Sequence, residues 1–282
     1  PASLLRSFVA HAEDRGDAFV RTETALVWTT QASSPQHRRS RLLTLRRFAL
    51  MMHAEDSRHE VPAADALGRA RFERRAPYIY APEEIAQLVR AAAAMGPART
   101  IRPQTYATLF GLLAATGLRV SEALALHCAD VTADGLVVRQ TKFRKDRLVP
   151  LHETTRAALD RYLEVRKRVA ACVPALFVSA SGKAPAYTTV GETFRRLVSE
   201  LGLRDRPDQP DARIHDLRHT FAVRSLEQCP GGQAAVARHV AGLSTYLGHV
   251  HVTDTYWYLH ATPLLMRRIA ERGEACYLGD PT

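Results

Sequence analysis

One stretch of the sequence decides the fold class: Leu136-Val137-Val138-Arg139-Gln140-Thr141-Lys142-Phe143-Arg144-Lys145-Asp146-Arg147-Leu148-Val149-Pro150-Leu151. Two runs rich in aliphatic and β-branched residues, 136–142 and 147–151, flank the polar segment 143–146, which predicts two strands joined as a hairpin. Apolar residues elsewhere recur mainly with helical spacing. The sequence therefore predicts a mainly α fold with one small antiparallel β-sheet.

Helical patterns extend on both sides of this hairpin. Before it, we expect helices at about 83–93, 104–115 and 120–127, with Gly117 as a helix stop. After it, we expect helices at about 153–168, 189–201, 216–226, 232–247, 253–259 and 264–271.

The N-terminal segment 3–74 also reads as helical. Its stretch 39–50 separates apolar from basic residues, with Leu42, Leu45, Ala49 and Leu50 near one face and Arg39, Arg46 and Arg47 mostly on another. The basic face suits DNA phosphates, and it suits a solvated surface equally well. A basic, proline-punctuated stretch between Arg69 and Pro82 is typical of an inter-domain linker. We therefore expect two domains, residues 1–75 and 76–282.

The composition narrows the class of protein. A net charge of +10 and a pI of about 9.8 favour a polyanionic partner, most often nucleic acid, although an arginine-rich composition can arise without one. No run of about 18 apolar residues predicts a membrane span. The four cysteines are spread widely without a C-x-x-C pair, which fits reduced thiols in a cytoplasmic protein.

Three segments hold residue types suited to phosphate chemistry. In Thr116-Gly117-Leu118-Arg119-Val120-Ser121-Glu122, the planar guanidinium of Arg119 suits two oxygens of one phosphate, and Glu122 is spaced to orient it. In the second segment, His215 and Arg218 have the spacing of one helix face. The third is Tyr246-Leu247-Gly248-His249, followed by Thr255-Tyr256-Trp257-Tyr258. Each segment by itself also fits an ordinary structural role.

Taken together, the segments resemble a known family. Thr116-Gly117-Leu118-Arg119, His215-x-x-Arg218, Leu247-Gly248-His249 and Tyr258 resemble, in order, the four signature boxes of the tyrosine recombinase (phage integrase) family. The hairpin ending in Arg147-Leu148-Val149-Pro150-Leu151 resembles the hairpin of that family and places its lysine at Lys142, although Phe143 stands where the family often has glycine. The N-terminal helices are similar to the family's core-binding (SAM-like) domain in length, helicity and basicity.

The resemblance implies a site-specific DNA recombinase or integrase that acts through a 3′-phosphotyrosine, without metal, ATP or other cofactor. The implied catalytic residues are Arg119, Lys142, His215, Arg218, His249 and Tyr258, with Glu122 in support. Arg119, Arg218 and His249 would stabilise the charge on the phosphate, and Tyr258 would be the nucleophile. By resemblance, His215 assists removal of the phenol proton and Lys142 is the general acid.

Several alternatives stay open at the level of sequence. Tyr256 is the fallback nucleophile and Lys145 the fallback acid. His215 and His219 have the spacing of a zinc-binding helix, but Asp216 stands where that motif needs Glu, and Arg218 lies between the two histidines. A type IB topoisomerase-like enzyme and a non-catalytic DNA-binding relative are the other candidate functions.

The resemblance also implies partners and a location. We expect double-stranded DNA as the partner and a homo-oligomer, a tetramer on two DNA sites, in the bacterial cytoplasm at the nucleoid. The amphipathic stretch 264–271 is expected to be a helix exchanged between neighbouring protomers, and a helix packed on its own domain is the alternative.

Overall fold

The chain divides into two compact units, Pro1–Arg74 and Arg75–Thr282. This computed structural model describes residues 2–267 except 69–75, 98, 140–145, 205, 206, 208, 209, 230–232, 250 and 260–266. Lys142, Lys145 and all but Arg267 of the expected helix 264–271 lie outside the described residues. No described helix is long and apolar enough to cross a membrane.

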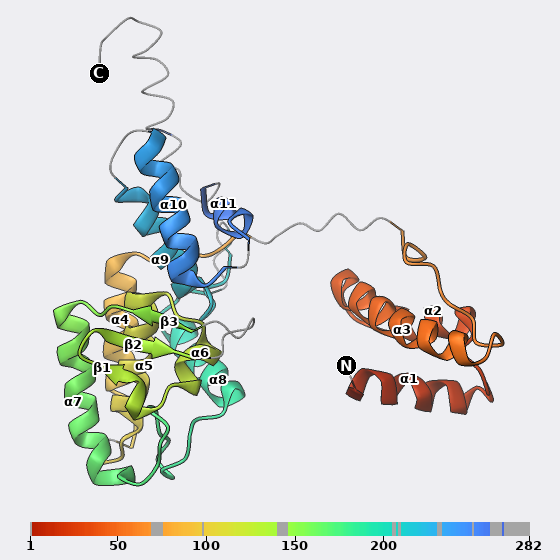
Figure 1. Cartoon of the computed structure of the whole chain (residues 1–282). Coiled ribbons are helices and arrows are strands. Elements are labelled where there is room, and N and C mark those ends of the chain that lie inside the picture. Colours follow the sequence, from red (N-terminus) through yellow and green to blue (C-terminus); the bar gives the residue numbers. More distant parts are fainter. Residues whose placement is uncertain are drawn as a thin grey trace, which may run out of the picture. The chain divides into compact units, whose positions relative to one another are not determined.

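The described part of the first unit contains three helices, α1 (Ala2–Asp14), α2 (Thr22–Thr30) and α3 (Pro35–Glu55) (Figure 1). Their small core includes Phe8 of α1 and Trp28 of α2, whose rings meet edge to face at 5.5 Å. The side chain of Ser34 caps α3 by accepting from the backbone N–H of His37, and Pro35 occupies the first turn. Local capping chemistry therefore fixes where α3 begins.

Helix α3 separates its apolar and basic residues less cleanly than the sequence predicts. Leu42, Leu45 and Ala49 are buried, but Leu50 is 49% exposed, because it lies about 100° around the helix from Ala49. Arg46 donates to the Pro62 carbonyl. This arginine therefore holds its own unit together, whereas Arg39 and Arg47 are exposed.

The second unit is mainly helical, as predicted. Its helices are α4 (Pro82–Ala93), α5 (Arg102–Thr116), α6 (Val120–Ala125), α7 (Glu153–Ala170), α8 (Tyr187–Glu200), α9 (Asp216–Glu227), α10 (Gln233–Leu247) and α11 (Thr253–Leu259). A 3-10 turn, η1 (Cys128–Asp130), follows α6, which ends two residues earlier than expected. The backbone N–H of His127 donates to the Asp130 carboxylate at 2.8 Å, so side-chain capping of η1 replaces the last predicted turn of α6.

The sheet has three antiparallel strands in the order β1 (Val131–Thr132), β2 (Gly135–Val138) and β3 (Arg147–Val149). The two strands of the predicted hairpin are present as β2 and β3. Strand β2 begins one residue earlier than expected and β3 ends two residues earlier, whereas residues 140–142 of the first predicted strand lie outside the described residues. The sequence does not predict strand β1, because two residues are too few to show an alternating pattern. The register pairs Val138 with Arg147. Arg147 therefore begins the strand that returns from the segment holding Lys142.

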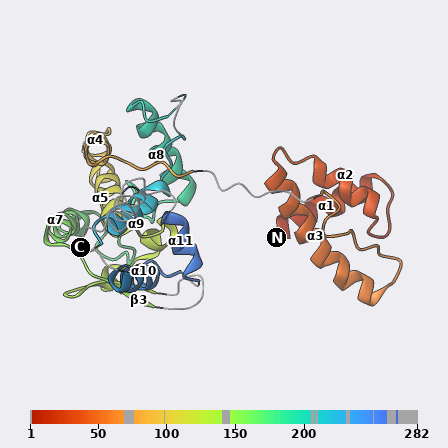
Figure 2. The ribbon, with the colours of Figure 1, turned by 90° about the horizontal axis from the view of Figure 1, so that it is seen from above.

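Gly117 ends α5 in the left-handed conformation, as the sequence predicts, with φ of 62°. A side chain here would be strained, and its Cβ would lie 2.6 Å from the ring of Phe221 on α9. Helices α9, α10 and α11 pack on one another, and α9 also contacts α5 (Figures 1 and 2). The segments that hold Arg119, Arg218 and Tyr258 therefore lie close together in the second unit.

Candidate functional site

Arg218 on α9 is the centre of the site. It is 2% exposed, and its Nη1 and Nη2 donate to the carbonyls of Gly117 and Leu247, each at 2.7 Å. Burial, followed by repulsion from Arg119, lowers the pKa of Arg218 to about 10, so the guanidinium is still charged at neutral pH. One buried cation thus joins the ends of α5 and α10.

A carboxylate shared by two arginines lies beside it. Glu122 accepts from Arg119 Nη1 at 2.7 Å and from the Arg119 backbone N–H at 2.9 Å. Arg147 donates to the same carboxylate from Nη2 at 2.7 Å and from Nη1 at 3.2 Å. Burial raises the pKa of Glu122, but the hydrogen bonds from Arg147 and Arg119 outweigh it and lower the pKa to about 2. Glu122 is therefore ionised, and the Arg119 side chain, 30% exposed, is held at the surface of the site.

Arg147 is a residue of the site that the sequence interpretation missed. Besides pairing with Glu122, it lies so close to Gly248 that a Cβ there would be 3.0 Å from Arg147 Nη1. Gly248 has φ of 68° and ends α10 directly before His249. The available signal was the position of Arg147 at the start of the second predicted strand. Arg147 therefore connects the base of the hairpin with two other segments of the site.

Replacement of Arg147 by Met tests this connection. The substitution leaves the buried Glu122 carboxylate with Arg119 as its remaining arginine partner, so we expect the free energy of unfolding to fall by about 3 kcal/mol. Arg196→Ala, which breaks the exposed Arg196–Glu200 pair, is the control and should cost about 0.5 kcal/mol or less. Urea unfolding of both variants measures the difference, and equal losses would contradict a special role for Arg147.

Tyr258 is the tyrosine that faces the site. It lies on α11 and is 3% exposed, whereas Tyr256 on the same helix is 47% exposed. Burial raises the pKa of Tyr258, and the positive charge of Arg218 partly offsets the rise. The phenol is thus placed next to the buried cation.

Two predicted histidines flank the same cation. The ring of His249 stacks on the ring of Tyr258 at 6.0 Å, and its Nδ1 is 2.8 Å from Thr255 Oγ1. His215 is the residue directly before α9 and is exposed, but partial desolvation of its ring, then repulsion from Arg218 and Arg119, lowers its pKa to about 4. Burial, then the same two arginines, lowers the pKa of His249 to about 4. Both imidazoles are therefore neutral at pH 7 and can accept a proton or a hydrogen bond.

The structure brings together six of the residues predicted from sequence: Arg119, Glu122, His215, Arg218, His249 and Tyr258. It adds Arg147 and also His219, whose ring contacts those of His215 and Tyr258. Among the residues described, no cluster of three or more His, Cys, Asp or Glu side chains could hold a metal ion, so the zinc alternative finds no ligand set there. The arrangement can bind an anion at its cations and offer it a phenol.

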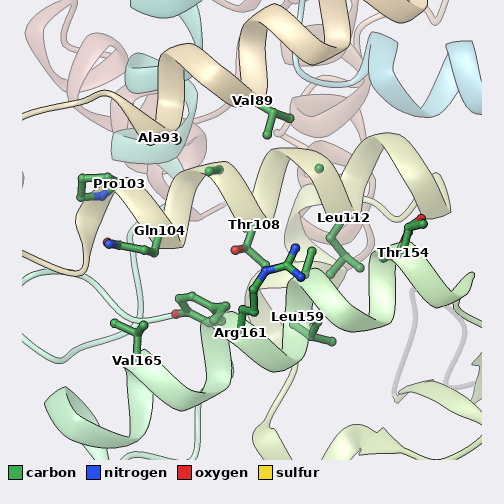
Figure 3. A pocket seen from close by; sticks show the side chains of 15 residues that line it. Val89, Ala93, Pro103, Gln104, Thr108, Leu112, Thr154, Leu159, Arg161 and Val165 are labelled. Atoms are coloured by element: carbon green, nitrogen blue, oxygen red, sulfur yellow. The ribbon is translucent and has the colours of Figure 1, made fainter.

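A cavity elsewhere in the second unit takes no part in this arrangement. It has a volume of about 590 Å³ and lies between α4, α5 and α7, lined by apolar side chains such as Val89, Leu112 and Leu159 with Arg161 at its side (Figure 3). None of the predicted site residues lines it.

Comparison with known proteins shows the family of the chain. Residues 80–264 match the Phage integrase family. The chain is 40% identical over 281 residues to the Sinorhizobium fredii protein y4rB, which carries the description integrase/recombinase, covering 96% of this chain and 89% of that protein. It is 32% identical to tyrosine recombinase XerD of Bifidobacterium longum, covering 82% and 72%. A structure of XerH site-specific recombinase bound to its difH substrate superimposes with a TM-score of 0.66 at 18% identity, covering 90% of this chain and 71% of XerH.

Proposed function

Because the chain belongs to the phage integrase family and is a site-specific tyrosine recombinase that cleaves and rejoins DNA, we propose that it does so with Tyr258 as nucleophile. The observation that carries this assignment is the burial of the Tyr258 phenol beside Arg218, with Arg119, His215 and His249 around the same cation.

The proposed reaction balances without an external energy source. The phenol oxygen of Tyr258 attacks the scissile phosphorus, the bond to the 5′-oxygen breaks, and a 3′-phosphotyrosine forms. Neutral His215 assists removal of the phenol proton. Arg119, Arg218 and His249 stabilise charge on the non-bridging oxygens. A 5′-hydroxyl of another strand then loses its proton and attacks the phosphorus, the bond to the Tyr258 oxygen breaks, and the phenol regains a proton. One phosphodiester replaces another, so no ATP is consumed.

An adduct experiment tests the proposal directly. DNA sites would first be recovered from genomic fragments bound by the full chain, and one site would then be made into a nicked substrate that traps the covalent intermediate. We expect a protein–DNA adduct whose digestion yields a nucleotide-bearing peptide modified at Tyr258. An adduct at another residue, or none on a tightly bound site, would overturn the assignment.

Lys142 is proposed as the general acid that protonates the 5′-oxygen, on the strength of its place in the predicted hairpin. Lys142→Ala should slow cleavage by about 100-fold or more, the usual contribution of a general acid. A substrate with sulfur at the 5′-bridging position should restore the rate, because a thiolate leaves without a proton. Lys145→Ala is the matched control, and rescue of that variant instead would transfer the role to Lys145.

We propose that the two units have different roles, DNA binding and catalysis. We assign residues 1–75 to a core-binding domain, with exposed Arg39 and Arg47 on α3 as phosphate contacts, and residues 76–282 to catalysis. We further propose that four protomers act on two DNA sites, joined by exchange of the helix predicted at 264–271. Support comes from the family and the amphipathic pattern of that stretch.

A further inference from the structure

His219 is a site residue to which the proposed chemistry gives no role. It follows Arg218 on α9 and is one helical turn from His215. Its ring contacts three others, those of His215 at 4.7 Å, Trp257 at 5.0 Å and Tyr258 at 5.4 Å. The imidazole therefore joins α9 to two consecutive aromatic residues of α11.

Hydrogen bonding at Nδ1 does not account for a histidine at this position. Its Nδ1 is buried and has no hydrogen-bond partner among the residues that the structure describes. Burial, followed by repulsion from His215, Arg213 and Arg218, lowers the pKa of His219 to about 3, so the ring is uncharged at neutral pH. What this side chain offers its neighbours is a neutral aromatic surface.

Helix α11 depends on packing against neighbouring side chains. Seven of its residues are described, and a helical segment of that length is unstable alone, so packing must hold it in place. Its packing against α9 and α10 includes Tyr258 in a shared apolar cluster, with Trp257 packed at the edge. The orientation of the phenol relative to Arg218 thus depends on the side chains that its ring touches.

We propose that His219 is a positioning residue, which holds the Tyr258 ring against α9 so that its oxygen points at the phosphate bound by Arg218. The inference rests on the proposed role of Tyr258 as nucleophile. It rests on the ring of His219 and not on Nδ1, since Nδ1 has no hydrogen-bond partner among the described residues. A misplacement of about 1 Å can cost on the order of 100-fold in rate, so losing the ring should have a large effect on cleavage alone.

The test compares two replacements in the full chain. His219→Phe keeps an aromatic ring without nitrogens, and His219→Gln keeps polar atoms without a ring. We expect His219→Gln to slow single-turnover cleavage at least about 10-fold with an unchanged Kd for DNA, and His219→Phe to cleave at least about 10-fold faster than His219→Gln. If His219→Gln cleaved as fast as His219→Phe, or faster, the proposal would be overturned.

A second histidine of the same unit provides the control. His239 on α10 is also partly buried, and its Nε2 is 3.0 Å from Ser225 Oγ. His239→Ala should leave the cleavage rate unchanged. If His239→Ala slowed cleavage as much as His219→Gln, the effect of both variants would come from weakened packing of the helices in general. If the wild-type adduct maps to Tyr258 and His219→Gln still cleaves normally, only the role of His219 fails. If the adduct maps elsewhere, the proposed function fails first.

Discussion

Tyr258→Phe is expected to abolish the covalent protein–DNA adduct while DNA binding persists. The Tyr258 ring is buried against His249 and His219, so phenylalanine keeps the packing and removes only the oxygen that would attack phosphorus. With no nucleophile, adduct formation on a nicked substrate should fall below detection. The Kd for the same DNA should change by less than about threefold, because phosphate contacts dominate affinity.

Tyr256→Phe is the matched control, since it removes the same oxygen two residues away on the same helix. Tyr256 is 47% exposed, so this variant should form adduct at the wild-type rate. Both variants would be measured by denaturing gel for adduct and by mobility shift for binding. Loss of adduct in Tyr256→Phe with retention in Tyr258→Phe would exchange the two assignments.

The second large effect is expected at Arg218, where one guanidinium serves both chemistry and structure. Arg218→Lys should lower the cleavage rate by about 100- to 1000-fold, the cost of removing one preorganised donor to a developing charge. It should also lower the free energy of unfolding by about 1–3 kcal/mol, because lysine cannot reproduce the fork that reaches the Gly117 and Leu247 carbonyls.

Arg224→Lys on the same helix separates these two effects. Arg224 also donates to a backbone carbonyl, that of Tyr80, but it is not among the residues of the site. We expect it to lose stability without a comparable loss of cleavage by the folded protein. Single-turnover cleavage and urea unfolding, measured side by side, give the comparison. Equal rate losses in the two variants would show that Arg218 acts through folding alone.

Much of this molecule could be predicted from local sequence. The helix at 253–259 has the predicted bounds, and Gly117 stops α5, because periodicity and backbone freedom act within a few residues. The pairing of Arg119 with Glu122 is equally local, since the two are three residues apart. Strand β1, with two residues, is too short for such patterns, and the exposure of Leu50 shows that a helix face is only approximately defined by spacing.

The features of the site likewise separate into those set by local sequence and those set by tertiary packing. By itself the sequence determined the family, the mainly helical fold and the residue types needed for metal-free phosphoryl transfer, because these reside in short motifs. Only the tertiary structure decided that Tyr258 is buried beside Arg218 while Tyr256 faces solvent, that Arg147 shares Glu122 with Arg119, and that His219 packs on Tyr258. These contacts join residues 25 or more positions apart in several cases, such as Arg147 and Glu122. Contacts of that kind depend on how helices and strands pack, and no local pattern encodes that packing.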